Sequence, residues 1–272
     1  STVPTIELKD LEVSGGNVNI TGGTLNGEGT ITVTAGNNNT IGQYTDDSET
    51  THTSENGINV SEGTVTVTAG NQTNIYGTVY GVEVNGKNSS VILNNGNINI
   101  TAGKNNTTES RGLSSENGGS IKVVSNGNLN IIAKNDDRTS RGVYSNAPAG
   151  VKSLINIDIE GNLDIKAEGS TAHGIYLTGS RDTSIDAKEG IDILAVGHGE
   201  ETYAYSVSGT NSKLISQGDI NLNINNEDSD YMSVGLFTDN QDTNISPIVN
   251  IEGNNVNIIS TGKNAGIYGV YN

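Results

Sequence analysis

The sequence predicts an all-β protein, a right-handed parallel β-helix of about eight coils, and three recurring patterns support this fold class. A seven-residue phrase of alternating apolar and polar residues recurs along the chain, a glycine-centred phrase recurs between its copies, and a short apolar stretch follows each glycine phrase. Each period of roughly 31 residues therefore holds three short strands, separated by Gly, Asn or Ser turns. We expect one continuous solenoid over residues 1–272.

The first phrase has the form Gly-Asn-apolar-Asn-apolar-x-Ala. Its alternation directs Ile98 and Ile100 inward and Asn97 and Asn99 outward. Because each strand pairs with its equivalent one coil away, Ile100 and Ile131 are predicted to stack. The copies are GNINITA at 96–102, GNLNIIA at 127–133, GNLDIKA at 161–167, EGIDILA at 189–195, GDINLNI at 218–224 and NNVNIIS at 254–260, with GTITVTA at 29–35 and GTVTVTA at 63–69 interpreted as upstream copies.

The glycine phrase carries aromatic residues at repeated positions. Its copies are SRGL at 110–113, SRGVY at 140–144, AHGIY at 172–176, SVGLF at 233–237 and AGIY at 265–268, with AYSV at 204–207 interpreted as a copy in which Ser206 replaces the glycine. One column lies two residues after the glycine and comprises Tyr144, Tyr176, Phe237 and Tyr268. The other precedes the glycine and comprises Tyr80, His173 and Tyr205. Ser114, Ser208 and Arg111 interrupt these columns. Exposed rings would form a platform for sugar faces or a partner's side chains, and rings stacked on one another would stiffen the solenoid.

Segments of variable length connect the first phrase to the glycine phrase at 36–56, 103–108, 134–139, 196–202 and 225–232. Because they leave the same corner of the coil, we expect them to line one edge of the rod. This edge is acidic, with Asp46, Asp47, Asp136, Asp137, Glu200, Glu201, Asp228 and Asp230. It would bind a partner or Ca²⁺, or its charges would serve only to solvate the loops. We expect no resident cofactor or metal, and Ca²⁺ at this edge is the alternative.

A column of outward amides and carboxylates is predicted along the first phrase, at Asn99, Asn130, Asp164, Asp192, Asn221 and Asn257. Amides aligned in this way can hydrogen-bond from one coil to the next. The flat polar face that results would also suit association between two rods.

Composition and charge exclude several classes of function. The net charge is −17 and the 14 basic residues are scattered, which argues against nucleic acid and anionic membranes as partners. Cysteine is absent, and no apolar run is long enough to insert into a membrane. Arg111 and Arg141 form a local basic pair, for which Asp136 and Asp137 are the predicted ion-pair partners. We therefore expect no enzyme activity, because no carboxylates converge with basic residues as in polysaccharide-degrading β-helices.

These phrases, with the Asn- and Thr-rich acidic composition, resemble the passenger region of Gram-negative autotransporter adhesins. The residues that carry the resemblance are GNLNIIA, GNLDIKA, SRGVY and AHGIY, within a stretch from about Ile31 to Tyr268. The resemblance implies display on a bacterial outer membrane, as a segment of a longer surface protein. It also implies attachment to a surface protein or glycan of a host cell or bacterium, homotypic association and biofilm formation.

The predicted function is therefore that of a non-enzymatic cell-surface adhesin segment. Three alternatives remain open at this point: a glycan-binding β-helix, a polysaccharide-degrading β-helix such as a phage tailspike or lyase, and a subunit that stacks end to end in an extracellular filament.

Overall fold

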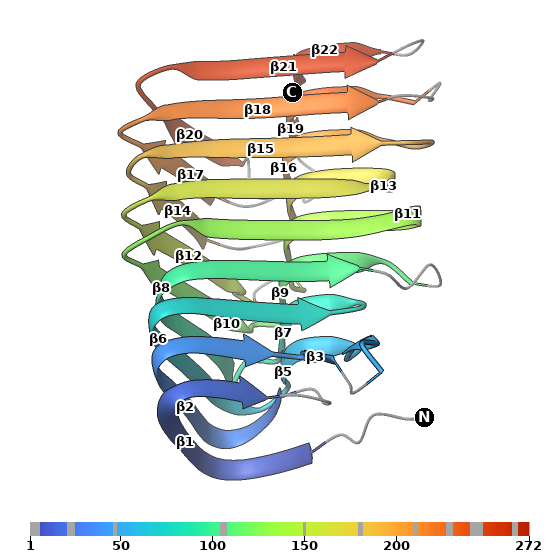
Figure 1. The fold of residues 1–272 in the computed structure, drawn as a ribbon. Helices are drawn as coiled ribbons and strands as arrows, with labels where there is room; N and C mark the ends of the chain where they lie inside the picture. Colours follow the sequence, from blue (N-terminus) through green and yellow to red (C-terminus); the bar gives the residue numbers. More distant parts are fainter. Residues whose placement is uncertain are drawn as a thin grey trace.

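The structure is a computed structural model that describes residues 6–20, 25–45, 48–103, 108–148, 151–178, 182–208, 211–226, 231–239, 247–262 and 266–271. The chain winds as a right-handed parallel β-helix of about seven turns, with its two ends at opposite ends of the rod (Figure 1). One sheet system contains 20 of the strands, and its pairings join each turn to the next. The predicted fold class is confirmed, with a turn count close to the eight expected.

Three faces form the wall of the solenoid, and the longest strands bend from one face into the next. Face 1 carries the Asn/Asp column. It comprises the carboxyl-terminal parts of β1 (Ile6–Ile20), β2 (Leu25–Ile41), β6 (Gly63–Gly77) and β8 (Ser89–Gly103), the amino-terminal parts of β11 (Leu129–Asn146) and β13 (Asn162–Thr178), and β15 (Gly190–Gly197), β18 (Asp219–Asn226) and β21 (Val256–Gly262).

Face 2 carries the glycine phrase. It comprises β5 (Asn56–Val60), β7 (Tyr80–Asn85), β9 (Ser110–Glu116), the carboxyl-terminal parts of β11 and β13, β16 (Thr202–Ser208), β19 (Ser233–Asp239) and β22 (Ile267–Tyr271).

Face 3 carries the short apolar stretch. It comprises residues 30–35 of β2, the amino-terminal parts of β6 and β8, and β10 (Ser120–Ser125), β12 (Leu154–Ile159), β14 (Asp182–Ala187), β17 (Asn211–Ser216) and β20 (Ile248–Glu252).

Columns of like side chains fill the interior. Ile100 and Ile131 are register partners and are almost fully buried, as the alternation of the first phrase predicts. The column that contains them runs through Ile75, Ile100, Ile131, Ile165, Ile193, Leu222 and Ile258. A parallel ladder satisfies each strand's backbone from both neighbours, so such narrow apolar columns are sufficient as a core.

The two upstream copies of the first phrase lie on a different face from the other copies. Val65 and Val67 of GTVTVTA pair with Val91 and Leu93, which places this segment on face 3, and GTITVTA pairs with it there. In the turn before Ile100, the core column is occupied by Ile75, which lies after GTVTVTA in the sequence. The prediction that 29–35 and 63–69 continue the first phrase is therefore wrong. Alternation alone does not distinguish one face of a β-helix from another, because all three faces alternate inward and outward residues.

The corner between faces 1 and 2 differs between turns, as expected. The carboxyl ends of the face 1 strands lie above one another at this corner (Figure 1). Within 36–56 the chain continues as β2 and then forms an antiparallel hairpin of β3 (Gln43–Thr45) and β4 (Thr51–Thr53). Residues 134–139 lie within the continuous strand β11, with a bulge at 136–138, rather than in the predicted loop. The register shift lies between Asn135 and Thr139, because the inserted residues have no partners in β13.

Candidate functional site

The glycine of the second phrase allows the backbone of face 2 to approach the core closely. A Cβ atom on Gly142 would lie 2.2 Å from Cγ2 of Ile165 and 2.6 Å from the carbonyl oxygen of Gly174. Gly112 and Gly174 meet the corresponding atoms of the next turn in the same way. Glycine is therefore required here for space.

Two outward columns flank this glycine, and we name them by their position relative to it. The pre-glycine column contains Tyr80, Arg111, Arg141, His173, Tyr203, Val234 and Tyr268. The post-glycine column contains Glu83, Ser114, Tyr144, Tyr176, Ser206, Phe237 and Tyr271.

This register corrects two predicted positions. Tyr268 lies in the pre-glycine column, and Tyr271 takes the place predicted for it beside Phe237. Tyr205 pairs with Ile175 and is fully buried in the core, so it is not part of an outward column. The misalignment arose because Ala204, not Ser206, replaces the glycine in that turn.

The two columns interleave to form one continuous stack, the ring stack. At its amino-terminal end, Arg111 provides the link that the sequence interpretation took for an interruption. Its guanidinium carbon lies 5.3 Å from the ring centroid of Tyr80 and 3.9 Å from that of Tyr144. Arg141 in turn lies 4.9 Å from the ring of Tyr144 and 5.2 Å from that of Tyr176. Cations and aromatic rings thus alternate over the first part of the stack.

Aromatic rings alone continue the stack toward the carboxyl end. Centroid distances are 4.6 Å from Tyr176 to His173, 5.0 Å from His173 to Tyr203 and 4.9 Å from Tyr203 to Phe237. The stack then reaches Tyr271 at 5.6 Å from Phe237. In all four contacts the ring planes are within 17° of parallel, so each ring covers the face of its neighbour.

Ring faces within the stack are therefore occupied by neighbouring side chains. His173 and Tyr203 are each 4% exposed, and Tyr144 is 7% exposed. A sugar face needs a free ring face, and among these rings only Tyr268 and Tyr271 are exposed, at 40% and 42%. The geometry favours the stiffening interpretation of the predicted columns over an open platform.

The two arginines of the stack share a carboxylate. Glu109 binds Arg111 through one oxygen and Arg141 through the other, and Arg111 also binds Glu116. The predicted pairing of these arginines with Asp136 and Asp137 is wrong, because the bulge in β11 exposes both aspartates. Asp136 contacts Lys134 instead, with 3.4 Å between carboxylate and ammonium.

His173 lies in the same column as the arginines but has different polar surroundings. Neither ring nitrogen has a hydrogen-bond partner. Burial, with a smaller contribution from Arg141, holds the pKa of the imidazole well below its usual value. His173 is therefore neutral at pH 7.

The acidic edge is only partly within the described residues. Asp46, Asp47, Asp228 and Asp230 lie outside them. Glu200 and Glu201 are exposed; Glu200 accepts a hydrogen bond from the hydroxyl of Thr171, and Glu201 is hydrogen-bonded to Tyr203. In the described part of the chain, no group of three or more acidic or histidine side chains is arranged to hold a metal ion.

A carboxylate missed by the sequence analysis lies near this edge. Glu168 of β13 pairs with Lys134 and Lys166, with 2.6 and 2.7 Å between the charged atoms. Hydrogen bonds from these two lysines lower the pKa of Glu168 to about 2. Its partner Lys134 lies one turn away, and no sequence pattern indicates which lysine the register brings to it.

The predicted column of outward amides forms hydrogen-bonded ladders on face 1. Asn130 donates to Asn99 at 2.8 Å, and Asn257 donates to Asn221 at 2.8 Å. Between these ladders, Asp164 and Asp192 are register partners. Burial and the neighbouring Asp192 carboxylate raise the pKa of Asp164. Beside the column, Ile132 and Ile259 are 43% and 53% exposed.

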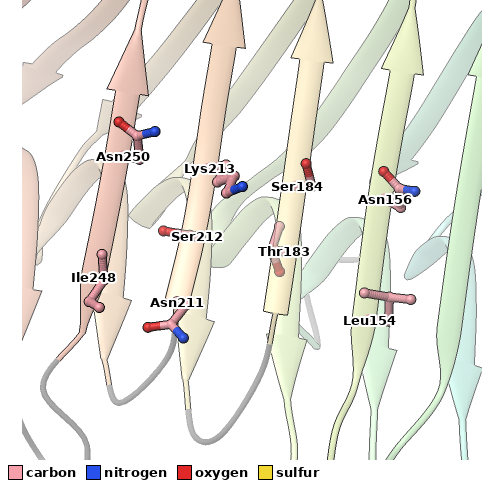
Figure 2. Close-up of a pocket in the computed structure, with 9 residues that line it drawn as sticks. All are labelled: Leu154, Asn156, Thr183, Ser184, Asn211, Ser212, Lys213, Ile248 and Asn250. Atoms are coloured by element: carbon pink, nitrogen blue, oxygen red, sulfur yellow. The ribbon is translucent and has the colours of Figure 1, made fainter.

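Face 3 has an outer groove of about 490 Å³ that the sequence analysis missed. Figure 2 shows one row of side chains along it, formed by Asn156, Ser184, Lys213 and Asn250 on four adjacent strands. Leu154 and Ile248, 41% and 66% exposed, also line it. Within the described residues the Lys213 ammonium has no ion-pair partner. Polar outward residues on strands are common, so composition did not distinguish this row from an ordinary solvated face.

In comparisons with known proteins, no protein family model, no curated protein and no solved structure matches the chain. Over its described residues the structure contains no helix long and apolar enough to span a bilayer.

Proposed function

We propose that this chain is a non-enzymatic segment of a bacterial cell-surface adhesin, displayed from the outer membrane. It would mediate attachment and self-association through repeated weak contacts along the rod. The observation that supports this most directly is the face 1 surface, where the Asn99–Asn130 ladder lies beside the exposed Ile132. A similar combination recurs at Asn221–Asn257 and Ile259. A second rod would meet this combination at two places along the rod, and contacts on one rigid body add as avidity.

The surroundings of Arg111 and Arg141 support a non-enzymatic role. A lyase or hydrolase that acts on acidic polysaccharides needs basic groups free to bind the substrate. Here Glu109 and the flanking tyrosine rings already occupy both guanidinium groups. Incubation with acidic polysaccharides should therefore give no shortened chains; shortening would contradict the proposal.

Sedimentation velocity over a range of protein concentrations tests self-association. We expect concentration-dependent dimers, and loss of them in Asn130→Glu with Ile132→Glu, because like charges would face each other across the interface. Ser184→Glu on face 3 is the matched control and should leave dimerisation unchanged. A wild-type chain that stays monomeric at the highest soluble concentration would contradict homotypic association.

Glycan binding through the groove of face 3 is the second candidate function. The row of amide, hydroxyl and ammonium groups offers donors and acceptors to a sugar chain that lies along the rod axis. On a glycan array, Ser184→Trp should abolish binding by filling the groove. Thr101→Trp, an outward substitution on face 1, should preserve it. Absence of saturable binding by the wild-type chain would dismiss this candidate.

A further inference from the structure

The pre-glycine column places three basic side chains on consecutive turns, and only two of them have counterions. Arg111 binds Glu109 and Glu116, and Arg141 binds Glu109. His173 follows in the next turn, stacked between Tyr176 and Tyr203. It is buried, and no acceptor faces either nitrogen. In this column, both arginines have a carboxylate as ion-pair partner, whereas a protonated His173 would have none.

We propose that His173 is an acid-sensitive joint in the ring stack, which opens the contact between β13 and β16 when its imidazole is protonated. This inference does not depend on the proposed adhesin function. It rests on the position of His173 in the stack and on the absence of an acceptor for a second ring proton.

Charged and titratable groups on every neighbouring element determine the direction of the effect. From β11, Arg141 and Tyr144 lie on the amino-terminal side, and Arg141 is already bound to Glu109. From β13 itself, Tyr176 covers one face of the imidazole. From the carboxyl-terminal side, Tyr203 of β16 covers the other face, and its hydroxyl is hydrogen-bonded to Glu201. Asp239 of β19 lies close enough to raise the pKa of Tyr203.

Arg141 is therefore the one charged group among these that shifts the pKa of His173, and it lowers that pKa. Stacking on two tyrosine rings favours an imidazolium by cation–π attraction. A buried cation without a counterion loses its hydration and gains no ion pair in return. Desolvation outweighs the ring contacts, so the proton binds mainly after the ring reaches water.

Linkage gives the sign and the size of the response. The folded-state pKa of His173 is lowered, so the stability that the neutral ring contributes is complete above the unfolded pKa of about 6.5 and is lost as the pH falls below it. Each unit of acidification should increase the open population about tenfold, because opening takes up one proton. The affected backbone amides are those of residues 202–208, which pair with β13.

Hydrogen exchange of the intact chain between pH 7 and pH 5, corrected for intrinsic exchange rates, tests the proposal. In the wild type, protection of the β16 amides should fall about tenfold for each pH unit below about 6.5. His173→Phe keeps a flat ring between Tyr176 and Tyr203 and should remove this pH dependence. His198→Phe, at a half-buried position before β16, is the control and should keep it.

A second measurement needs no variant. Imidazole NMR resonances of the wild-type chain should show that the His173 ring stays neutral well below pH 6.5 in the closed state. Titration of His173 at its ordinary pKa would overturn the proposal. An unchanged pH dependence of β16 protection in His173→Phe would overturn it as well.

Discussion

Ala204 replaces the glycine of face 2, and Leu222 of the next turn replaces the isoleucine of the core column. In the preceding turn, a Cβ on Gly174 would lie 2.2 Å from Cγ2 of Ile193. Leucine has no Cγ2 methyl on its Cβ, so Leu222 leaves room for the methyl group of Ala204. The two departures from the repeat are complementary in shape.

We expect Leu222→Ile to destabilise the protein by about 1–3 kcal/mol, because it restores a methyl branch against the Ala204 side chain. Adding Ala204→Gly should recover most of this loss. Urea unfolding of the two single variants and the double variant measures the coupling as a double-mutant cycle. A neutral Leu222→Ile would show that the two positions are independent.

Gly142→Ala should destabilise face 2 by about 1–3 kcal/mol or more, because its Cβ would collide with Ile165 and with the backbone of Gly174. Gly16→Ala is the matched control on an open strand, since a Cβ at Gly16 meets no atom within 4 Å. It should change the free energy of unfolding by less than about 0.5 kcal/mol. Equal effects of the two substitutions in urea unfolding would rule out the steric explanation.

Glu109→Gln should lower the free energy of unfolding by about 1–3 kcal/mol, because it leaves Arg111 and Arg141 with one carboxylate between them. The side chain of Glu109 is 28% exposed, and solvent screening keeps the loss at the lower end for a buried pair. Lys134→Gln removes two ion pairs on the exposed side of the rod, to Asp136 and Glu168, and should lose less than about 1 kcal/mol. Chemical unfolding at low and high salt distinguishes the two, and equal losses would contradict a special role for Glu109.

Asp164→Asn should stabilise the protein at pH 7. The folded-state pKa of Asp164 is raised, so the folded chain holds its proton to higher pH than the unfolded chain, and stability falls as the pH rises through the folded pKa. An amide at this position removes the repulsion from Asp192 and provides a donor toward the neighbouring turns. The gain should disappear near pH 3, where the Asp164 carboxyl is protonated. Asp137→Asn, at an exposed bulge residue, should show no such gain in thermal unfolding followed from pH 3 to pH 7.

Much of the fold could be predicted because the period and the alternation are properties of neighbouring residues. The inward position of Ile98 and Ile100 and the stacking of Ile100 on Ile131 follow from strand geometry once a parallel solenoid is assumed. The phase of the upstream turns was not predicted. Val65 alternates as Ile98 does, and only pairing with Val91 places it on face 3.

The site was harder to predict, because its contacts join turns whose relative register varies. Tyr144 and Tyr176 were predicted to share a column and do so. Tyr268 was predicted to lie in the post-glycine column because Gly266 lies two residues before it. The pairing of β22 with β19 shows that it lies in the pre-glycine column. The shared carboxylate of Glu109 follows no local pattern, because its two arginines lie on different turns.

By itself, the sequence determined which side chains of the first phrase face the interior and which face outward, because alternation along a strand is a local property of the backbone; Tyr205, in the glycine phrase, was predicted outward and is buried. Only the tertiary structure decided which outward side chains touch. Contacts across turns depend on the register of each turn and on bulges such as that in β11. Insertions at one corner change that register without altering the alternation. For this reason the amide ladders could be predicted. The continuous stack from Tyr80 to Tyr271 and the lack of a hydrogen-bond partner for His173 could not.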